Sequence, residues 1–171
     1  TEDILFVESL IKEPKYKSSF DHNLWIWETY DSQNKYFMVA DVARGDGADY
    51  SVFHIFRNDT MEQVAEYKGK LPTKEYARAL MTMATEYNKA LLVVENANVG
   101  WAVIQEVLDS NYDNLFYSSA DLQYVDVENQ MTNKLNGQEK KMTPGFTTSN
   151  KTRPLVISKL ESYFRNKEVI I

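Results

Sequence analysis

Two acidic residues end apolar runs in a pattern that suits the binding of a divalent metal ion. Asp41 ends the run YFMVAD, and Glu95 ends the run LLVVE. If the two runs form neighbouring strands that point the same way, the two carboxylates meet at one edge of a sheet. Such a pair of like charges is costly unless a cation compensates it. Mg²⁺ or Mn²⁺ suits this position, because hard cations bind carboxylate oxygens and leave other positions open for water and phosphate.

The chemistry that such a site supports is the hydrolysis of a phosphodiester. Two ions about 3.5 to 4 Å apart can activate the attacking water and stabilise the leaving oxygen. A third acid, Asp49, follows Asp41 by eight residues and lies beyond a turn that contains Gly45 and Gly47.

Other functions are compatible with the same residues. For either acid alone, a role as a turn former or as the partner of a lysine or arginine is the better explanation. A strand, an acid and a glycine turn also occur in phosphate-binding loops of the actin and sugar-kinase type, in which backbone amides hold the phosphate. A non-catalytic docking module is the third alternative, although it leaves the acids without a role.

Apolar periodicity predicts a mixed α/β sheet around these acids. The runs 24–30, 35–42, 49–57 and 61–69 have the pattern of strands separated by polar turns, which indicates an antiparallel meander. The run 90–96 is continuously apolar, which is typical of a parallel strand buried on both faces.

The remaining elements are predicted from helical spacing and turn residues. A helix is expected over 74–88, with Thr73 as its cap, a second from Val99, a strand over 114–119, and a last strand in the terminal EVII. Pro154 suits the first turn of a third helix. Its apolar stripe would consist of Val156, Ile157, Leu160, Tyr163 and Phe164.

Length and composition indicate one globular domain over residues 1–171. Residues 1–23 are expected to form a lead-in segment, and 120–150 a long polar insertion. The chain has no cysteine, which excludes disulfides and zinc–thiolate sites. Its net charge of −6 argues against tight DNA binding by electrostatics alone but is compatible with a cation site. No apolar stretch is long enough to span a membrane, so we expect a soluble, intracellular protein without membrane contact.

The order of four segments resembles the nuclease domain of the large terminase subunit of tailed phages, close to the T4-like type. The segments are YFMVADVARGDGADYSVFHIF, ALLVVENANVGWAVIQEVL, YDNLFYS and GFTTSNKTRPLVISKLESYF, and the resemblance runs from about residue 24 to the end. It implies a ribonuclease-H-like mixed sheet with helices on both faces and the core order β-β-β-α-β-α-β-α-β. It also implies an endonuclease that cuts concatemeric double-stranded DNA with Mg²⁺ or Mn²⁺ during genome packaging, at the packaging motor in the cytoplasm of the infected bacterium.

The resemblance assigns roles to the acids. Asp41 would be the central metal ligand, Glu95 the second acid, and Asp49 a further acid that the glycine turn returns to the site to bind water, metal or a lysine. The family also has a third catalytic aspartate in an Asn-Asp-Asp-like motif after the last strand, and no such motif occurs before Ile171. We therefore expect a fragment with weak cleavage activity, which in the full protein follows an ATPase domain and works with the portal and the small terminase subunit.

The most basic part of this acidic chain is expected to face the DNA. Its cationic residues are Lys134, Lys140, Lys141, Lys151 and Arg153. The last two stand at the start of the third predicted helix, where backbone donors and the helix dipole also favour phosphate. An equally good explanation is that these residues only keep a polar loop soluble.

Overall fold

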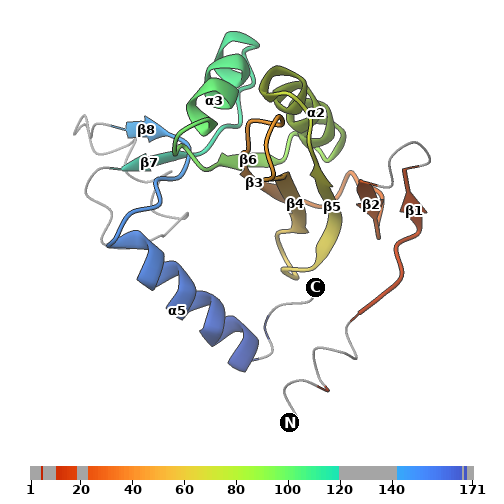
Figure 1. Ribbon diagram of the computed structural model, residues 1–171. Coiled ribbons are helices and arrows are strands. Elements are labelled where there is room, and N and C mark those ends of the chain that lie inside the picture. The colour runs from red at the N-terminus through yellow and green to blue at the C-terminus, as the bar shows by residue number, and fades with distance from the viewer. Residues whose placement is uncertain (1–4, 6–10, 19–22, 120–141, 167, 169–171) are drawn as a thin grey trace.

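A six-stranded sheet forms the centre of the computed structural model, which describes residues 5, 11–18, 23–119, 142–166 and 168 (Figure 1). The strands lie in the order β1-β2-β5-β4-β3-β6. Their bounds, in that order, are Tyr16–Lys17, Leu24–Ile26, Gln63–Gly69, Ser51–Arg57, Tyr36–Asp41 and Leu91–Val94. A separate pair consists of β7 (Tyr117–Ser119) and β8 (Met142–Pro144).

The antiparallel meander is present, but it begins one strand later than predicted. β3, β4 and β5 pair antiparallel in succession, whereas β2 pairs with β5 on the far side of that unit. The predicted neighbours 24–30 and 35–42 are therefore separated by two strands. The chain leaves β2 at Trp27, whose N–H still donates to the Val64 carbonyl at 2.8 Å, and then crosses to β3.

β6 is the parallel strand that the apolar run predicted. It pairs with β3, and on its other side the Leu92 N–H donates to the Asn114 carbonyl at 2.9 Å. The prediction that β6 is buried on both faces was wrong, because Leu92 and Val94 are fully buried, whereas Leu91 and Val93, which alternate with them, are partly exposed.

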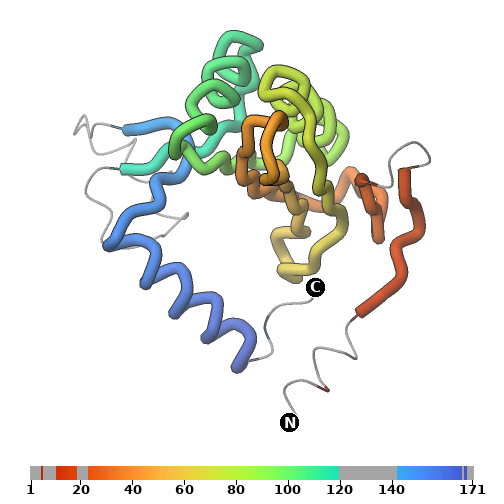
Figure 2. The backbone as a smooth tube through the Cα atoms, viewed as in Figure 1, coloured from red at the N-terminus to blue at the C-terminus, as the bar shows by residue number. Residues whose placement is uncertain are grey.

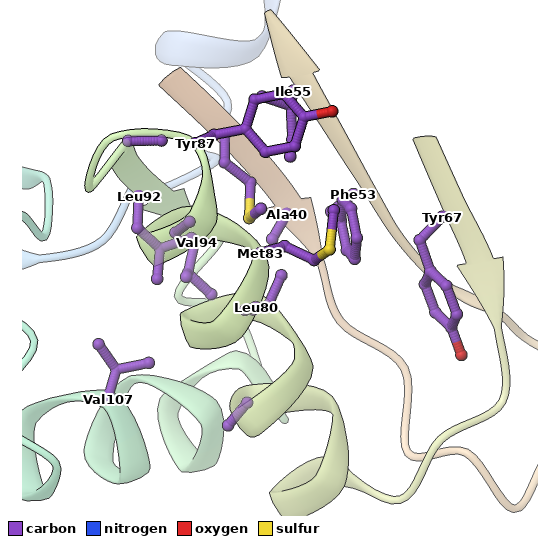
Figure 3. Close-up of a cluster of buried hydrophobic side chains, with 14 of the residues drawn as sticks. Ala40, Phe53, Ile55, Tyr67, Leu80, Met83, Tyr87, Leu92, Val94 and Val107 are labelled. Atoms are coloured by element: carbon purple, nitrogen blue, oxygen red, sulfur yellow. The ribbon is translucent and has the colours of Figure 1, made fainter. Parts of the chain in front are cut away.

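Two helices cover one face of the sheet. They are α2 (Thr73–Glu86) and α3 (Gly100–Asp109), and Figure 2 shows them side by side. The helical spacing of Tyr76, Leu80 and Ala84 brings these buried side chains onto the sheet, and Figure 3 shows Leu80 with the strand residues of the core. Thr73 is the first helical residue and not the cap, since Pro72 occupies the cap position without a side-chain hydrogen bond.

The third predicted helix is α5 (Thr152–Arg165), and Figure 1 shows it away from α2 and α3, on the other side of the sheet. Pro154 lies in its first turn, as predicted. Its apolar stripe is not packed, because none of its residues is buried and Ile157 is 55% exposed. The predicted insertion 120–150 contains β8 at one end and lies mainly outside the described residues, as does most of the predicted final strand. Among the described helices, none is long and apolar enough to cross a membrane.

Candidate active site

Asp41 and Glu95 are brought together by the pairing of β3 with β6. Ala40 is the register partner of Val94, and the Glu95 N–H donates to the Ala40 carbonyl at 3.0 Å. The two acids follow this last pair on strands that run in the same direction. The structure therefore confirms the predicted adjacency, whereas their role as metal ligands stays a prediction.

The two carboxyl groups interact strongly enough to perturb ionisation. Partial burial, followed by the negative charge of Glu95, raises the pKa of Asp41 above its ordinary value. A hydrogen bond with the Glu95 side chain and the charge of Asp49 act in the same direction, while a hydrogen bond from the Val42 backbone opposes them. No lysine, arginine or histidine of the described chain forms an ion pair with these three acids. Their charge is left for a cation to balance.

An open cavity of about 320 Å³ lies at this end of the sheet. Its lining brings together four acids, Asp41, Asp46, Asp49 and Glu95. Asp46 also forms an ion pair with Arg44 at 3.5 Å, so it is the least available of the four. The sequence interpretation proposed neither Asp46 nor Tyr50 as a site residue, although both line the cavity.

The loop after β3 is closed by Ser51. The buried Ser51 hydroxyl accepts a hydrogen bond from the Ala43 N–H at 3.0 Å and lies 3.2 Å from the Ala43 carbonyl, to which it can donate. Gly45 is required in this loop, since its φ is +84° and a Cβ would lie 2.5 Å from the Leu71 carbonyl oxygen. Gly47 was also assigned to the tight turn, but a Cβ there meets nothing within 4 Å.

The loop after β6 holds Glu95 from the other side. Gly100 begins α3 so close to Glu95 that a Cβ would lie 1.9 Å from the Glu95 carbonyl oxygen. Asn96 is buried and donates to the Pro144 carbonyl at 3.1 Å and to the Thr147 hydroxyl at 2.9 Å. Asn96 is a positioning residue that the sequence did not reveal, because its partners lie about fifty residues away.

The predicted DNA-binding residues are not part of this cavity. Lys151 and Arg153 are exposed at the start of α5 and do not line it. Lys134, Lys140 and Lys141 lie outside the described residues. Within the described chain, no three acids or histidines are arranged closely enough to hold a metal ion by themselves. The site as described thus supplies two adjoining carboxylates and a third nearby.

Solved structures with a similar fold include nuclease domains of phage large terminases. The crystal structure of the large terminase nuclease from thermophilic phage G20c with bound magnesium superposes with a TM-score of 0.65, at 18% identity, over 95% of this chain and 69% of that one. The chain has the fold of a phage large terminase nuclease. The G20c nuclease with bound zinc gives a TM-score of 0.64 at 17% identity, covering 99% of this chain and 80% of that one.

A second phage gives the same result. The Thermus phage P74-26 large terminase nuclease domain has a TM-score of 0.63 at 19% identity and covers 95% of this chain and 67% of that one. The sequence matches no protein-family model and no curated protein. The ribonuclease-H-like mixed α/β sheet expected from the resemblance is confirmed, and at these identities the likeness concerns the fold.

Proposed function

We propose that this chain is the nuclease domain of a phage large terminase subunit, which cuts double-stranded DNA with a divalent metal ion during genome packaging. The observation that carries the proposal is the uncompensated pair Asp41 and Glu95 at the ends of parallel strands β3 and β6. Support comes from the shared fold and from similar nucleases crystallised with bound magnesium, cobalt and zinc.

The donor set fits Mg²⁺ or Mn²⁺. Both acids offer hard oxygen ligands, and no ion pair of the described chain includes Asp41 or Glu95. Asp41 and Glu95 would hold the ion, and Asp49 would add a carboxylate at the cavity wall. Bound metal supplies an activated water and neutralises charge on the phosphate.

The residues of the chain have separate tasks in this proposal. Asp41 and Glu95 are fixed by the hydrogen bond between their strands, so their carboxylates are positioned before the substrate binds. Asp49 has no ion pair in the described chain and can orient a water or accept a proton at the open side of the cavity. Asn96 and Gly100 keep the loop after Glu95 in place.

A phosphate-loop ATPase is not favoured by this geometry. Its nucleotide would have to lie against the backbone of the turn between β3 and β4. That turn contributes Asp46 and Asp49 to the cavity wall, and both carboxylates repel phosphate unless a cation intervenes. The acids are therefore suited to bind a cation, and a phosphate could then bind to that cation.

The partners belong to the same proposal. We infer that double-stranded DNA is the substrate, that Lys134, Lys140, Lys141, Lys151 and Arg153 contribute to its binding, and that the longer protein joins this domain to an ATPase domain. The domain would act with the portal and the small subunit at the packaging motor in the cytoplasm of the infected bacterium. The similar nucleases support this assignment.

Metal binding and cleavage test the proposal together. Titration calorimetry without DNA should show Mn²⁺ binding to the wild-type chain and at least about tenfold weaker binding to Asp41→Asn and Glu95→Gln, because each loses a charged ligand. Plasmid nicking should fall in the same variants. Asp113→Asn is the matched control, since Asp113 is exposed and paired with Lys89 away from the cavity. Unchanged Mn²⁺ affinity and nicking in Asp41→Asn would refute the assignment.

A further inference from the structure

We propose that Tyr50, Lys68 and Lys70 form a phosphate-binding cluster that holds the DNA strand beside the point of cleavage. This inference rests on the proposed nuclease function and adds residues to it. The three residues are called the Tyr50 cluster below. Lys68 lies on β5, Lys70 directly after it, and Tyr50 directly before β4, and neither lysine was among the DNA-binding residues expected from the sequence.

The register of the sheet connects the Tyr50 cluster with the acids. Asp41 is the partner of Val52 on β4, and Val52 is the partner of Lys68 on β5. Directly opposite residues point to the same face, and neighbouring strands are about 4.8 Å apart, so Lys68 stands about 10 Å from Asp41. Both side chains are exposed, while Ala40 and Tyr67 beside them are buried on the helix-covered face.

Two ammonium groups converge on one aromatic ring. Lys68 Nζ lies 5.0 Å and Lys70 Nζ 4.7 Å from the centroid of the Tyr50 ring. Lys70 Nζ also donates to the Gly47 carbonyl at 3.1 Å. Tyr50 is 47% exposed and lines the acidic cavity, so the lysines stand at its rim. The ring and the carbonyl hold the two like charges in place.

No carboxylate of the described residues forms an ion pair with these lysines. Some cations of the described chain are paired, for example Arg57 with Glu28 and Glu62, whereas no ion pair among the described residues includes Lys68 or Lys70. Two fixed, unpaired ammonium groups on one ring are suited to bind an anion. Because the acidic cavity adjoins them, the anion must belong to a molecule that also presents a group for the metal.

A DNA strand meets both requirements. Successive phosphates of one strand lie only a few ångströms apart, so two groups about 10 Å apart can contact phosphates within about three nucleotides of each other. One phosphate can lie at Asp41 and Glu95 while another, a few nucleotides away, contacts the Tyr50 cluster. Contacts to phosphate position the duplex without reading its sequence. The Tyr50 cluster should therefore fix where the strand lies without selecting which sequence is cut.

The test compares two double variants of equal charge. Binding of a labelled duplex is measured by fluorescence anisotropy at several salt concentrations. Lys68→Gln with Lys70→Gln should weaken binding about tenfold and reduce the slope of log K against log salt by about 2, since each phosphate contact contributes about 0.9. Lys89→Gln with Lys159→Gln is the control, because Lys159 also lies over a tyrosine, 5.3 Å from Tyr163, but on α5.

The role of the ring is tested in the same assay. Tyr50→Phe keeps the aromatic face and should bind DNA within about twofold of wild type, whereas Tyr50→Ala should lose affinity as the lysine variants do. Mn²⁺ affinity measured by calorimetry should be unchanged in all of them, which shows that the fold and the carboxylates are intact.

The outcomes separate the two proposals. One outcome is that the wild-type chain binds Mn²⁺ through Asp41 and nicks DNA, while Lys68→Gln with Lys70→Gln binds DNA with the same affinity and salt slope as the control double variant. In that case the inference is wrong and the nuclease function stands. If the wild-type chain binds neither Mn²⁺ nor the duplex, the nuclease function and the inference are both wrong. A loss of DNA affinity and salt slope that is confined to the Tyr50 cluster supports the inference.

Discussion

The two faces of the sheet are built from alternate residues of the same strands, yet they face opposite environments. On β3, Met38 and Ala40 are buried on the face covered by α2 and α3, whereas Val39 and Asp41 on the open face are exposed. The covered face is apolar and closely packed. The open face carries all the chemistry proposed above. A one-residue change of register would turn the buried apolar side chains of the strand to the open face and its functional side chains into the core.

The kind of side chain on the open face changes from one end of the strands to the other. Across the end with the acids, the register aligns Asp41, Val52 and Lys68. At the far end Phe37 and Phe56 stack with ring centroids 5.2 Å apart. Acids without an ion pair in the described chain thus lie where strands β3 and β6 end, His54 and Glu66 face each other at 3.5 Å in the middle of the face, and aromatic stacking follows at the far end.

Gly100→Ala should produce the largest effect, because Gly100 begins a helix of the covered face and also contacts the backbone of Glu95. The added Cβ would overlap the Glu95 carbonyl oxygen, so α3 or the loop after β6 must shift. Overpacking of this kind costs about 1–3 kcal/mol, and a displaced ligand weakens metal binding about 10–100-fold. Denaturant unfolding and Mn²⁺ calorimetry measure the two effects. Gly47→Ala should change neither, since a Cβ there has free space.

A pair of identical substitutions compares the faces directly. Val94→Ala on the covered face removes methyl groups from a fully buried side chain and should lower the free energy of unfolding by about 2 kcal/mol. Val39→Ala on the open face starts from a side chain that is 41% exposed and should cost less than about 1 kcal/mol. Equal losses in urea denaturation would mean that another part of the protein covers the open face.

The smallest expected effect is a gain of stability from Asp41→Asn without metal. The pKa of Asp41 is raised in the folded state, so its contribution to stability is lost as the pH rises through that raised value. Asparagine does not ionise, and thermal midpoints compared from about pH 4 to about pH 8 should increasingly favour the variant. Added Mn²⁺ should reverse the order by stabilising only the wild type. A variant that is less stable throughout would contradict this reasoning.

The sequence predicted the parts of the site that depend on local pattern. The apolar runs before Asp41 and Glu95 identified two strands whose ends carry acids, and the structure places those ends together. The Tyr50 cluster could not be predicted, because it depends on the register of β4 with β5 and on their irregularity between Ile55 and Phe56. Asn96 was missed for the same reason, since its hydrogen bonds reach β8 and Thr147.

For α5, the sequence predicted the helix but not the environment of its apolar stripe. Its helical spacing was recognised correctly, but an apolar stripe in a sequence specifies only that a surface exists and not what it contacts. Helix formation follows from near neighbours in the chain, whereas burial depends on other elements. For the same reason β2 was recognised as a strand but assigned to the wrong neighbour.

The bonds along the outer side of β6 also affect how copies of the chain meet. The Phe116 N–H donates to the Leu92 carbonyl at 2.9 Å and the Phe146 N–H to the Val94 carbonyl at 2.8 Å, so these edge carbonyls are already occupied. At the other end of the sheet, β1 is only two residues long. A sheet protected at both margins is a poor template for strand pairing with another molecule. The described edges of the sheet therefore disfavour strand pairing between copies of the domain.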